Sequence, residues 1–185
     1  MKRLFIAVPV VLSDDFLKLS ARIQQKMSRD QVVWVQPQLQ HLTLRFLGAT
    51  PDYQIEPLIS VMREISSKNK KFELRLDKIG VFGSRYAPTT IWYGFNEFDS
   101  FKNLFEQLEP RLIEMGFEPN YGNLVPHLTV GRIKKIENKQ LFTNHITQLQ
   151  PTFKQSVAVD TLHLIRSKLT PQGPVYKTLE VFPLQ

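Results

Sequence analysis

Hydrophobic and polar positions change their period several times along the chain, and the changes predict strands alternating with helices. Alternating or continuous apolar runs predict strands at 4–9, 32–35, 41–47, 72–82, 90–95, 126–133, 156–167 and 176–182. Helical spacing predicts helices at 13–29, within 51–67, from 98 to near Gly116 with a disturbance at Pro110, and within 137–149. Strands outnumber helices and many neighbouring strands are expected to be antiparallel. The predicted fold class is therefore α+β.

The order of strand, helix and second strand occurs twice. Leu4 in the first strand and His41 in a later one are 37 positions apart, and Ile91 and His127 are 36 positions apart. The near match predicts two related halves packed about a pseudo-twofold axis.

The same short phrase stands at the equivalent place in each half. It reads His41-Leu42-Thr43-Leu44 in the first half and His127-Leu128-Thr129-Val130 in the second. Because side chains alternate along a strand, each phrase presents an imidazole and a hydroxyl on one face and apolar anchors on the other. One such tripeptide is common by chance. A matched pair indicates a site in which the two faces meet across a cleft.

Two facing imidazoles suit acid–base chemistry. Neutral imidazole accepts a proton and imidazolium donates one, and the ordinary pKa lets both forms exist near neutral pH. One histidine could deprotonate water while the other protonates a leaving oxygen. The Thr43 and Thr129 hydroxyls could then bond the non-bridging oxygens of a phosphate held between the rings.

The candidate site predicts neither a metal nor a cofactor. A dinuclear metal site would need carboxylates beside the histidines, and neither phrase supplies one. The chain has no cysteine, which excludes disulfides and thiolate ligands. It also lacks the glycine-rich phosphate loops of nucleotide-cofactor enzymes.

Two arginines are candidates for holding phosphate. Strict alternation places Arg45 on the face of His41. Arg132 is five residues after His127 and would face away from it unless the strand contains a bulge. The alternative for both is a solvated surface position.

The other histidines and several aromatic residues have weaker signals. His145 lies on a polar predicted helix and is expected at the surface, and His163 sits among apolar residues and is expected to be structural. Phe5, Phe46 and Tyr86 alternate with positive charges and could stack on bases, although most such rings belong to cores.

Charge favours a polyanionic partner. The formal net charge is +7 and the sequence pI is about 9.7.

Lys2, Arg3 and the apolar residues after them look like a signal peptide, but Pro9 and the helix start at Ser13 favour a buried strand. No apolar stretch is long enough for a membrane span. We expect a cytoplasmic monomer.

Several motifs resemble the 2H phosphoesterase superfamily, and within it the RNA 2′,3′-cyclic phosphodiesterases, historically called 2′-5′ RNA ligases. The resemblance covers nearly the whole chain. It rests on residues 3–7, 34–35, 41–48, 126–129, Arg132, 166–167 and 173–176. The paired His-x-Thr-x phrases in this order and spacing are its most specific part.

The resemblance implies one bilobal domain over residues 1–185, with intertwined half-repeats, outer helices and a central cleft lined by both motif strands. It implies metal-independent hydrolysis of RNA 2′,3′-cyclic phosphate to a 2′-phosphate end. His41 is then the proton donor to the departing 3′ oxygen, and His127 accepts the proton of water. Thr43, Thr129, Arg132 and Arg45 are the expected substrate-binding residues.

Three alternatives remain open. The substrate could be a small cyclic nucleotide such as ADP-ribose cyclic phosphate, or the enzyme could act as a reversible 2′-5′ ligase. A protein of another class, an RNA-end binder without catalysis, is predicted by the charge but leaves the matched histidines unexplained.

Overall fold

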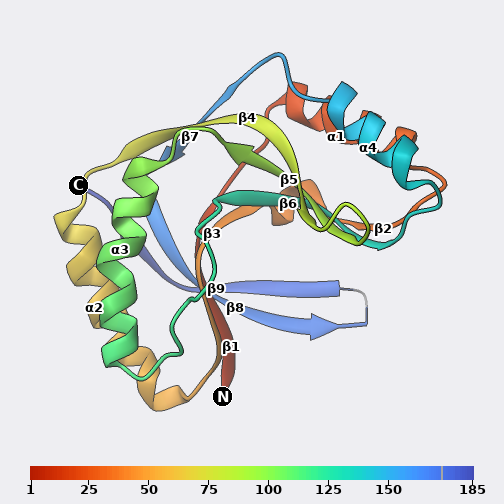
Figure 1. Ribbon diagram of the computed structural model, residues 1–185. Helices are drawn as coiled ribbons and strands as arrows, with labels where there is room; N and C mark the ends of the chain where they lie inside the picture. Colours follow the sequence, from red (N-terminus) through yellow and green to blue (C-terminus); the bar gives the residue numbers. More distant parts are fainter. Residues whose placement is uncertain (172) are drawn as a thin grey trace.

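The computed structural model describes residues 1–171 and 173–185, which form two antiparallel sheets and four α-helices (Figure 1). The strands are β1 (Lys2–Pro9), β2 (Gln31–Trp34), β3 (His41–Thr50), β4 (Phe72–Gly83), β5 (Pro88–Phe95), β6 (His127–Lys135), β7 (Gln155–Val159), β8 (Thr161–Thr170) and β9 (Gly173–Pro183). The helices are α1 (Asp14–Lys26), α2 (Ile55–Lys68), α3 (Asp99–Glu114) and α4 (Lys139–Gln148), with short 3₁₀ turns at Pro37–Leu39 and Asp52–Gln54. The α+β prediction is confirmed.

The two sheets have corresponding strand orders, and the second sheet has one additional strand, β2. The first sheet runs β3-β1-β8-β9, and the second runs β2-β6-β5-β4-β7. All the pairs are antiparallel. If β2 is set aside, β3, β1, β8 and β9 correspond in order to β6, β5, β4 and β7. The motif strands β3 and β6 occupy equivalent positions.

Local signals explain where the first helix begins. The Ser13 hydroxyl accepts a hydrogen bond from the Phe16 N–H at 3.5 Å, and Asp14 and Asp15 place negative charge at the positive end of the helix dipole. Phe16, Leu19, Ile23 and Met27 are buried and follow the helical spacing that predicted this helix. The third helix has nearly its predicted extent, and α3 continues through Pro110 to Glu114.

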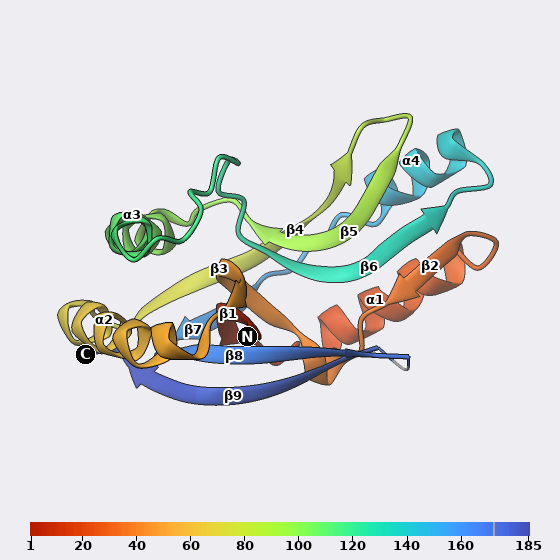
Figure 2. The same ribbon diagram turned by 90° about the horizontal axis from the view of Figure 1, so that it is seen from below.

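Two helices contact a sheet other than the one that contains the strand before them. Helix α1 follows β1 of the first sheet but packs on β5 of the second, where the Phe16 and Tyr93 rings are 4.9 Å apart. The Ser20 hydroxyl also lies 2.8 Å from the Tyr93 hydroxyl. Helix α3 follows β5 but contacts β3. One hydrophobic core therefore extends through both sheets, with α1 and α4 at one end and α2 and α3 at the other (Figures 1 and 2).

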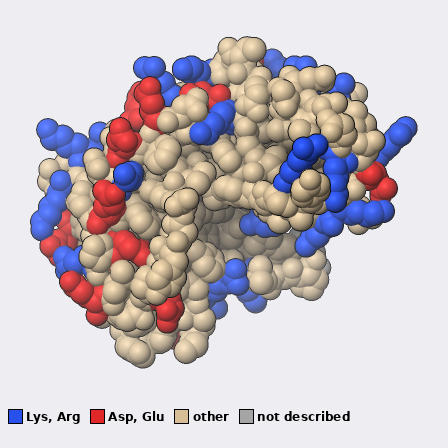
Figure 3. All heavy atoms as spheres, in the orientation of Figure 1, with Lys and Arg blue, Asp and Glu red and all other residues tan. Residues whose placement is uncertain are grey.

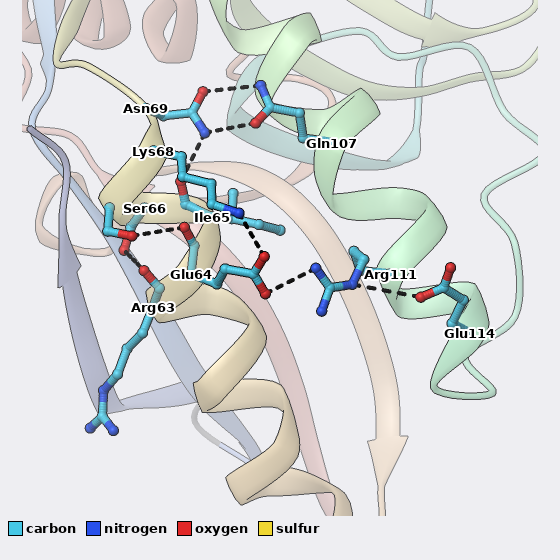
Figure 4. Close-up of polar contacts among 10 residues, drawn as sticks. Arg63, Glu64, Ile65, Ser66, Lys68, Asn69, Gln107, Arg111 and Glu114 are labelled. Atoms are coloured by element: carbon cyan, nitrogen blue, oxygen red, sulfur yellow. Dashed lines mark hydrogen bonds and ion pairs between the residues drawn. The ribbon is translucent and has the colours of Figure 1, made fainter.

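A polar network joins α2 to α3 across the halves (Figure 4). The side-chain amides of Asn69 and Gln107 exchange two hydrogen bonds of 2.9 and 3.1 Å. Nearby, Glu64 lies 3.0 Å from Arg111 and 2.8 Å from Lys68. These groups are largely exposed, so the network fixes how the helices pair and contributes little to stability.

The strand predicted at 156–167 is wrong, because the chain forms two strands in different sheets there. Strand β7 ends at Val159, and β8 begins at Thr161 after Asp160. Before the break the buried side chains stand at odd positions, Val157 and Val159, and directly after it they stand at even positions, Leu162 and Leu164. The change of phase marks the crossing from one sheet to the other.

Within the described ranges, no helix is both long enough and apolar enough to pass through a bilayer.

Candidate functional site

The two motif strands meet at their beginnings. Gln40, buried just before His41, donates a hydrogen bond from Nε2 to the Thr129 carbonyl at 3.0 Å. The Val35 N–H donates to the Val130 carbonyl at 2.9 Å, one residue further along β6. Both histidine phrases therefore lie at the junction of the two sheets, and the surface is hollowed near the middle of the face in Figure 3.

Both histidines adopt the same tautomer. His41 Nδ1 lies 2.8 Å from the Leu39 carbonyl oxygen, and His127 Nδ1 lies 2.7 Å from the Val125 carbonyl oxygen. A carbonyl oxygen only accepts, so each Nδ1 carries the hydrogen and donates it. The Nε2 of each neutral ring then has a free lone pair. In both halves the chain two residues upstream orients the ring.

Aromatic rings contact both imidazoles. The His41 ring centroid lies 4.9 Å from that of Phe5 and 5.2 Å from that of Tyr176. The His127 centroid lies 4.7 Å from that of Phe82, with the planes perpendicular. These contacts restrict both rings and partly remove them from water.

Trp92 packs beside His127 on the second sheet. Its indole lies across Gly80 and Gly94, where an added Cβ would stand 2.1 Å and 2.4 Å from ring carbons. Only glycine leaves room for the indole at these two positions. Thr129 pairs with Trp92 across the sheet, so the indole lies on the face that carries His127 and Thr129.

Burial and charge lower both histidine pKa values. Removal from water disfavours the imidazolium and lowers the pKa of His41 and of His127, and the hydrogen bonds to the backbone carbonyls oppose part of this effect. The positive charge of Arg132 lowers the pKa of both rings further. The charge of His127 also lowers the pKa of His41, so the two groups interact electrostatically.

A β-bulge decides where Arg132 points. Gly131 pairs with Ile91 while Thr129 pairs with Trp92, so Val130 is an extra residue in β6. The bulge returns Arg132 to the face of Thr129 and His127. The sequence predicts Arg132 on this face only if the strand contains a bulge. Arg132 is exposed, and it has no ion-pair partner in residues 1–171 and 173–185.

The same kind of bulge makes the expectation for Arg45 wrong. Thr43 pairs with Ala7 and Arg45 pairs with Ile6, so the residue between them, Leu44, is extra in β3. Arg45 therefore points to the side of Ile6, which is the core side, and not to the side of His41. Phe46 takes the place on the His41 face that alternation gave to Arg45.

Arg45 is held by a carboxylate of α3. Its Nε lies 2.6 Å from Glu109, its Nη2 lies 3.1 Å from the other carboxylate oxygen, and Nη2 also donates to the Glu118 carbonyl. The side chains of Arg45 and Glu109 are only 10% and 13% exposed. The geometry assigns Arg45 to the contact between β3 and α3.

Replacing Arg45 with Ala is expected to lower the free energy of unfolding by about 3 kcal/mol, because Glu109 would keep a partly buried charge without its partner. Chemical denaturation measures the change. Arg63→Ala is the matched control, since its pair with Glu180 is much more exposed and should contribute less than about 1 kcal/mol. Equal losses in the two variants would contradict a structural role for Arg45.

Both threonines stand beside their histidines. Thr43 and Thr129 are half-buried on the faces of His41 and His127. In the part of the chain that the structure describes, neither hydroxyl has a hydrogen-bond partner. They are free to bond a ligand between the imidazoles.

Of the remaining histidines, His163 lies two strands away from Thr43 on the same face of the first sheet, because Ala7 pairs with both residues. His163 pairs with Ala7 in the first sheet, and its Nε2 lies 3.1 Å from the Thr161 hydroxyl. His145 is half-buried on α4. Across residues 1–171 and 173–185, no three His, Cys, Asp or Glu side chains gather in a way that could hold a metal ion.

The sequence did not point to Gln40 or Tyr176 as site residues. Gln40 links the motif strands, yet an isolated glutamine before a strand carries no pattern. Tyr176 reaches His41 from β9, the far edge of the sheet, which only the strand order brings near. The run at 4–9 did predict a strand, but not that Phe5 would contact a histidine.

Known proteins match nearly the whole chain. The family described as LigT like Phosphoesterase matches residues 6–93 and 96–176. An RNA 2′,3′-cyclic phosphodiesterase of Methanothermobacter thermautotrophicus is 34% identical over 184 residues, which cover 98% of each chain. One from Aquifex aeolicus is 35% identical over 154 residues, covering 82% of this chain and 81% of the relative.

Solved structures share the fold. A crystal structure of a protein from Thermus thermophilus has a TM-score of 0.79 at 27% identity and covers 98% of this chain and 97% of its own. The structure of E. coli LigT complexed with 3′-AMP has a TM-score of 0.76 at 21% identity and covers 100% of this chain and 98% of its own.

Proposed function

Because the chain belongs to the LigT-like phosphoesterase family, we propose that it hydrolyses the 2′,3′-cyclic phosphate at RNA ends and leaves a 2′-phosphate. Relatives that are 34% and 35% identical are RNA 2′,3′-cyclic phosphodiesterases. The observation that carries the proposal is the pair of imidazoles at the junction of the sheets, each with Nδ1 bound to a carbonyl and Nε2 free.

In the proposed reaction, water attacks phosphorus and the bond from phosphorus to the 3′ oxygen breaks. His127 accepts a proton of the water at Nε2, and His41 as imidazolium gives its Nε2 proton to the departing 3′ oxygen. The products are a 2′-phosphate and a free 3′-hydroxyl. Both rings have the same tautomer, so the choice of donor and acceptor follows the family resemblance.

The remaining groups suit the charge of the phosphate. The free hydroxyls of Thr43 and Thr129 can donate to its non-bridging oxygens, and the Arg132 guanidinium offsets the charge that grows there in the transition state. These steps use side chains only, and we propose that hydrolysis needs no metal.

The pH dependence of kcat/KM should be bell-shaped, with its maximum below pH 6.5. The active form holds one proton on the pair, and burial lowers the pKa of both rings in the free enzyme. The profile for kcat should lie at higher pH, because bound phosphate favours the imidazolium. Rates from pH 4.5 to 9 with chemistry rate-limiting test this. A flat kcat/KM profile would contradict a paired acid and base.

The direct test offers a short RNA ending in 2′,3′-cyclic phosphate to the enzyme in EDTA. We expect turnover at an unchanged rate and a 2′-phosphate product, identified by NMR or by resistance to 3′-phosphatase. Loss of activity in EDTA that a divalent ion restores would show that a metal takes part. Salt-sensitive binding without turnover would favour a binding protein instead.

A further inference from the structure

Phe46 exposes an aromatic ring on the face of the first sheet that carries His41. The bulge at Leu44 turns Phe46 to this face, where it pairs with Phe5. Phe5 is 3% exposed and contacts His41, whereas Phe46 remains 43% exposed. A large ring left open in mid-strand beside a site is available for a ligand.

Arg3 lies over the Phe46 ring and extends the exposed surface around it. Its guanidinium carbon lies 4.7 Å from the centroid of Phe46. Arg3 pairs with Ser167, and Ser167 pairs with Tyr176, so these residues form a row across neighbouring strands. Tyr176 contacts His41, and the surface is therefore continuous with the candidate site.

The two motif strands place different chemistry after the same bulge. In β6 the residue three positions beyond the motif threonine is Arg132, and in β3 it is Phe46. The second half of the site offers a cation to the phosphate, and the first half offers an aromatic face. Such a pair of groups suits a phosphate with a base attached nearby.

The spacing fits a neighbouring nucleotide. Phe46 follows Thr43 by three residues, and the strand rise gives roughly 7–10 Å between them when the bulge is allowed for. This backbone separation places Phe46 beside the position of a phosphate bonded to Thr43 and not at it. It is about the length of one nucleotide.

We propose that Phe46 and Arg3 form a subsite for the nucleotide next to the terminal cyclic phosphate, with its base stacked on Phe46 and its phosphodiester beside Arg3. The inference rests on the proposed function and narrows its substrate class to oligonucleotides. Stacking on an aromatic ring accepts every base, so this subsite should show little base preference.

A cycle of two enzymes and two substrates tests the subsite. The enzymes are the wild type and Phe46→Ala, and the substrates are two short RNAs ending in 2′,3′-cyclic phosphate, one with a base and one abasic at the penultimate nucleotide. In the wild type, removing the base should lower kcat/KM about tenfold. In Phe46→Ala, the two RNAs should differ less than about twofold, since the stacking partner is already gone.

Leu141→Ala is the control for loss of an exposed apolar side chain, because Leu141 on α4 is 48% exposed and lies far along the chain from this surface. It should keep the full difference between the two RNAs. Arg3→Ala should reduce the slope of log kcat/KM against log salt by about one, the change expected when one phosphate contact is lost.

Two results would overturn the subsite. One is an equal loss for both RNAs in Phe46→Ala. The other is a wild type that hydrolyses a mononucleoside 2′,3′-cyclic phosphate as efficiently as the RNA, which would leave the proposed function standing. Failure to hydrolyse any cyclic phosphate would instead refute the proposed function.

Discussion

His127→Ala and His41→Ala should each lower kcat/KM for an RNA 2′,3′-cyclic phosphate by roughly 10²- to 10⁴-fold, because each removes one of the two proton transfers at phosphorus. The double variant should lose far less than the product of the single losses, since the two rings act in the same step. Circular dichroism and thermal unfolding should show a retained fold, because both rings are only half-buried.

The two roles can be separated by the leaving group. His41→Ala should recover activity on a p-nitrophenyl phosphodiester, whose leaving group needs no proton, whereas His127→Ala should not. His145→Ala is the matched control, because His145 lies on α4 away from the motif strands and should leave the rate unchanged. Near-normal turnover in both site variants would end the proposed mechanism.

Arg132→Ala should lower kcat by about 10²- to 10³-fold, the size of loss that follows removal of one preorganised group at a developing oxyanion. It should also move the kcat/KM maximum to higher pH. Burial lowers the pKa of both histidines, and the charge of Arg132 lowers it further, so removing that charge lets both rings keep their protons longer.

Arg132→Lys should restore the pH maximum while recovering only part of kcat, because lysine keeps the charge but not the planar fork. Lys139→Ala removes an equal charge at the start of α4 and serves as the control. A rate loss without a pH shift would place Arg132 away from the histidines.

Much of the fold could be predicted because the spacing of apolar residues indicates whether a segment is a strand or a helix. A continuous apolar run located β1, alternation located β3 and β6, and helical spacing located α1. The pair of histidine phrases also located the junction where β3 and β6 meet. These features depend on local pattern alone.

The orientation of each arginine depends on one extra residue in its strand, and only the expectation for Arg45 is wrong. A bulge at Leu44 turned Arg45 to the core, and a bulge at Val130 turned Arg132 to the site. The two arginines have similar sequence settings but opposite surroundings, and Glu109 on α3 holds only the first. Pairing partners distant in sequence decide such cases, so strict alternation could not.

Helices α1 and α3 each contact the sheet that does not contain the strand before them, so the two sheets share part of their covering. Tyr93 of β5 packs against Phe16 of α1, and α3 contacts β3. If the two sheets moved apart, the Phe16 and Tyr93 rings would be exposed to water, which costs free energy. We therefore expect β3 and β6 to keep their relative position when a ligand binds, because a large separation of the two sheets would expose apolar surface.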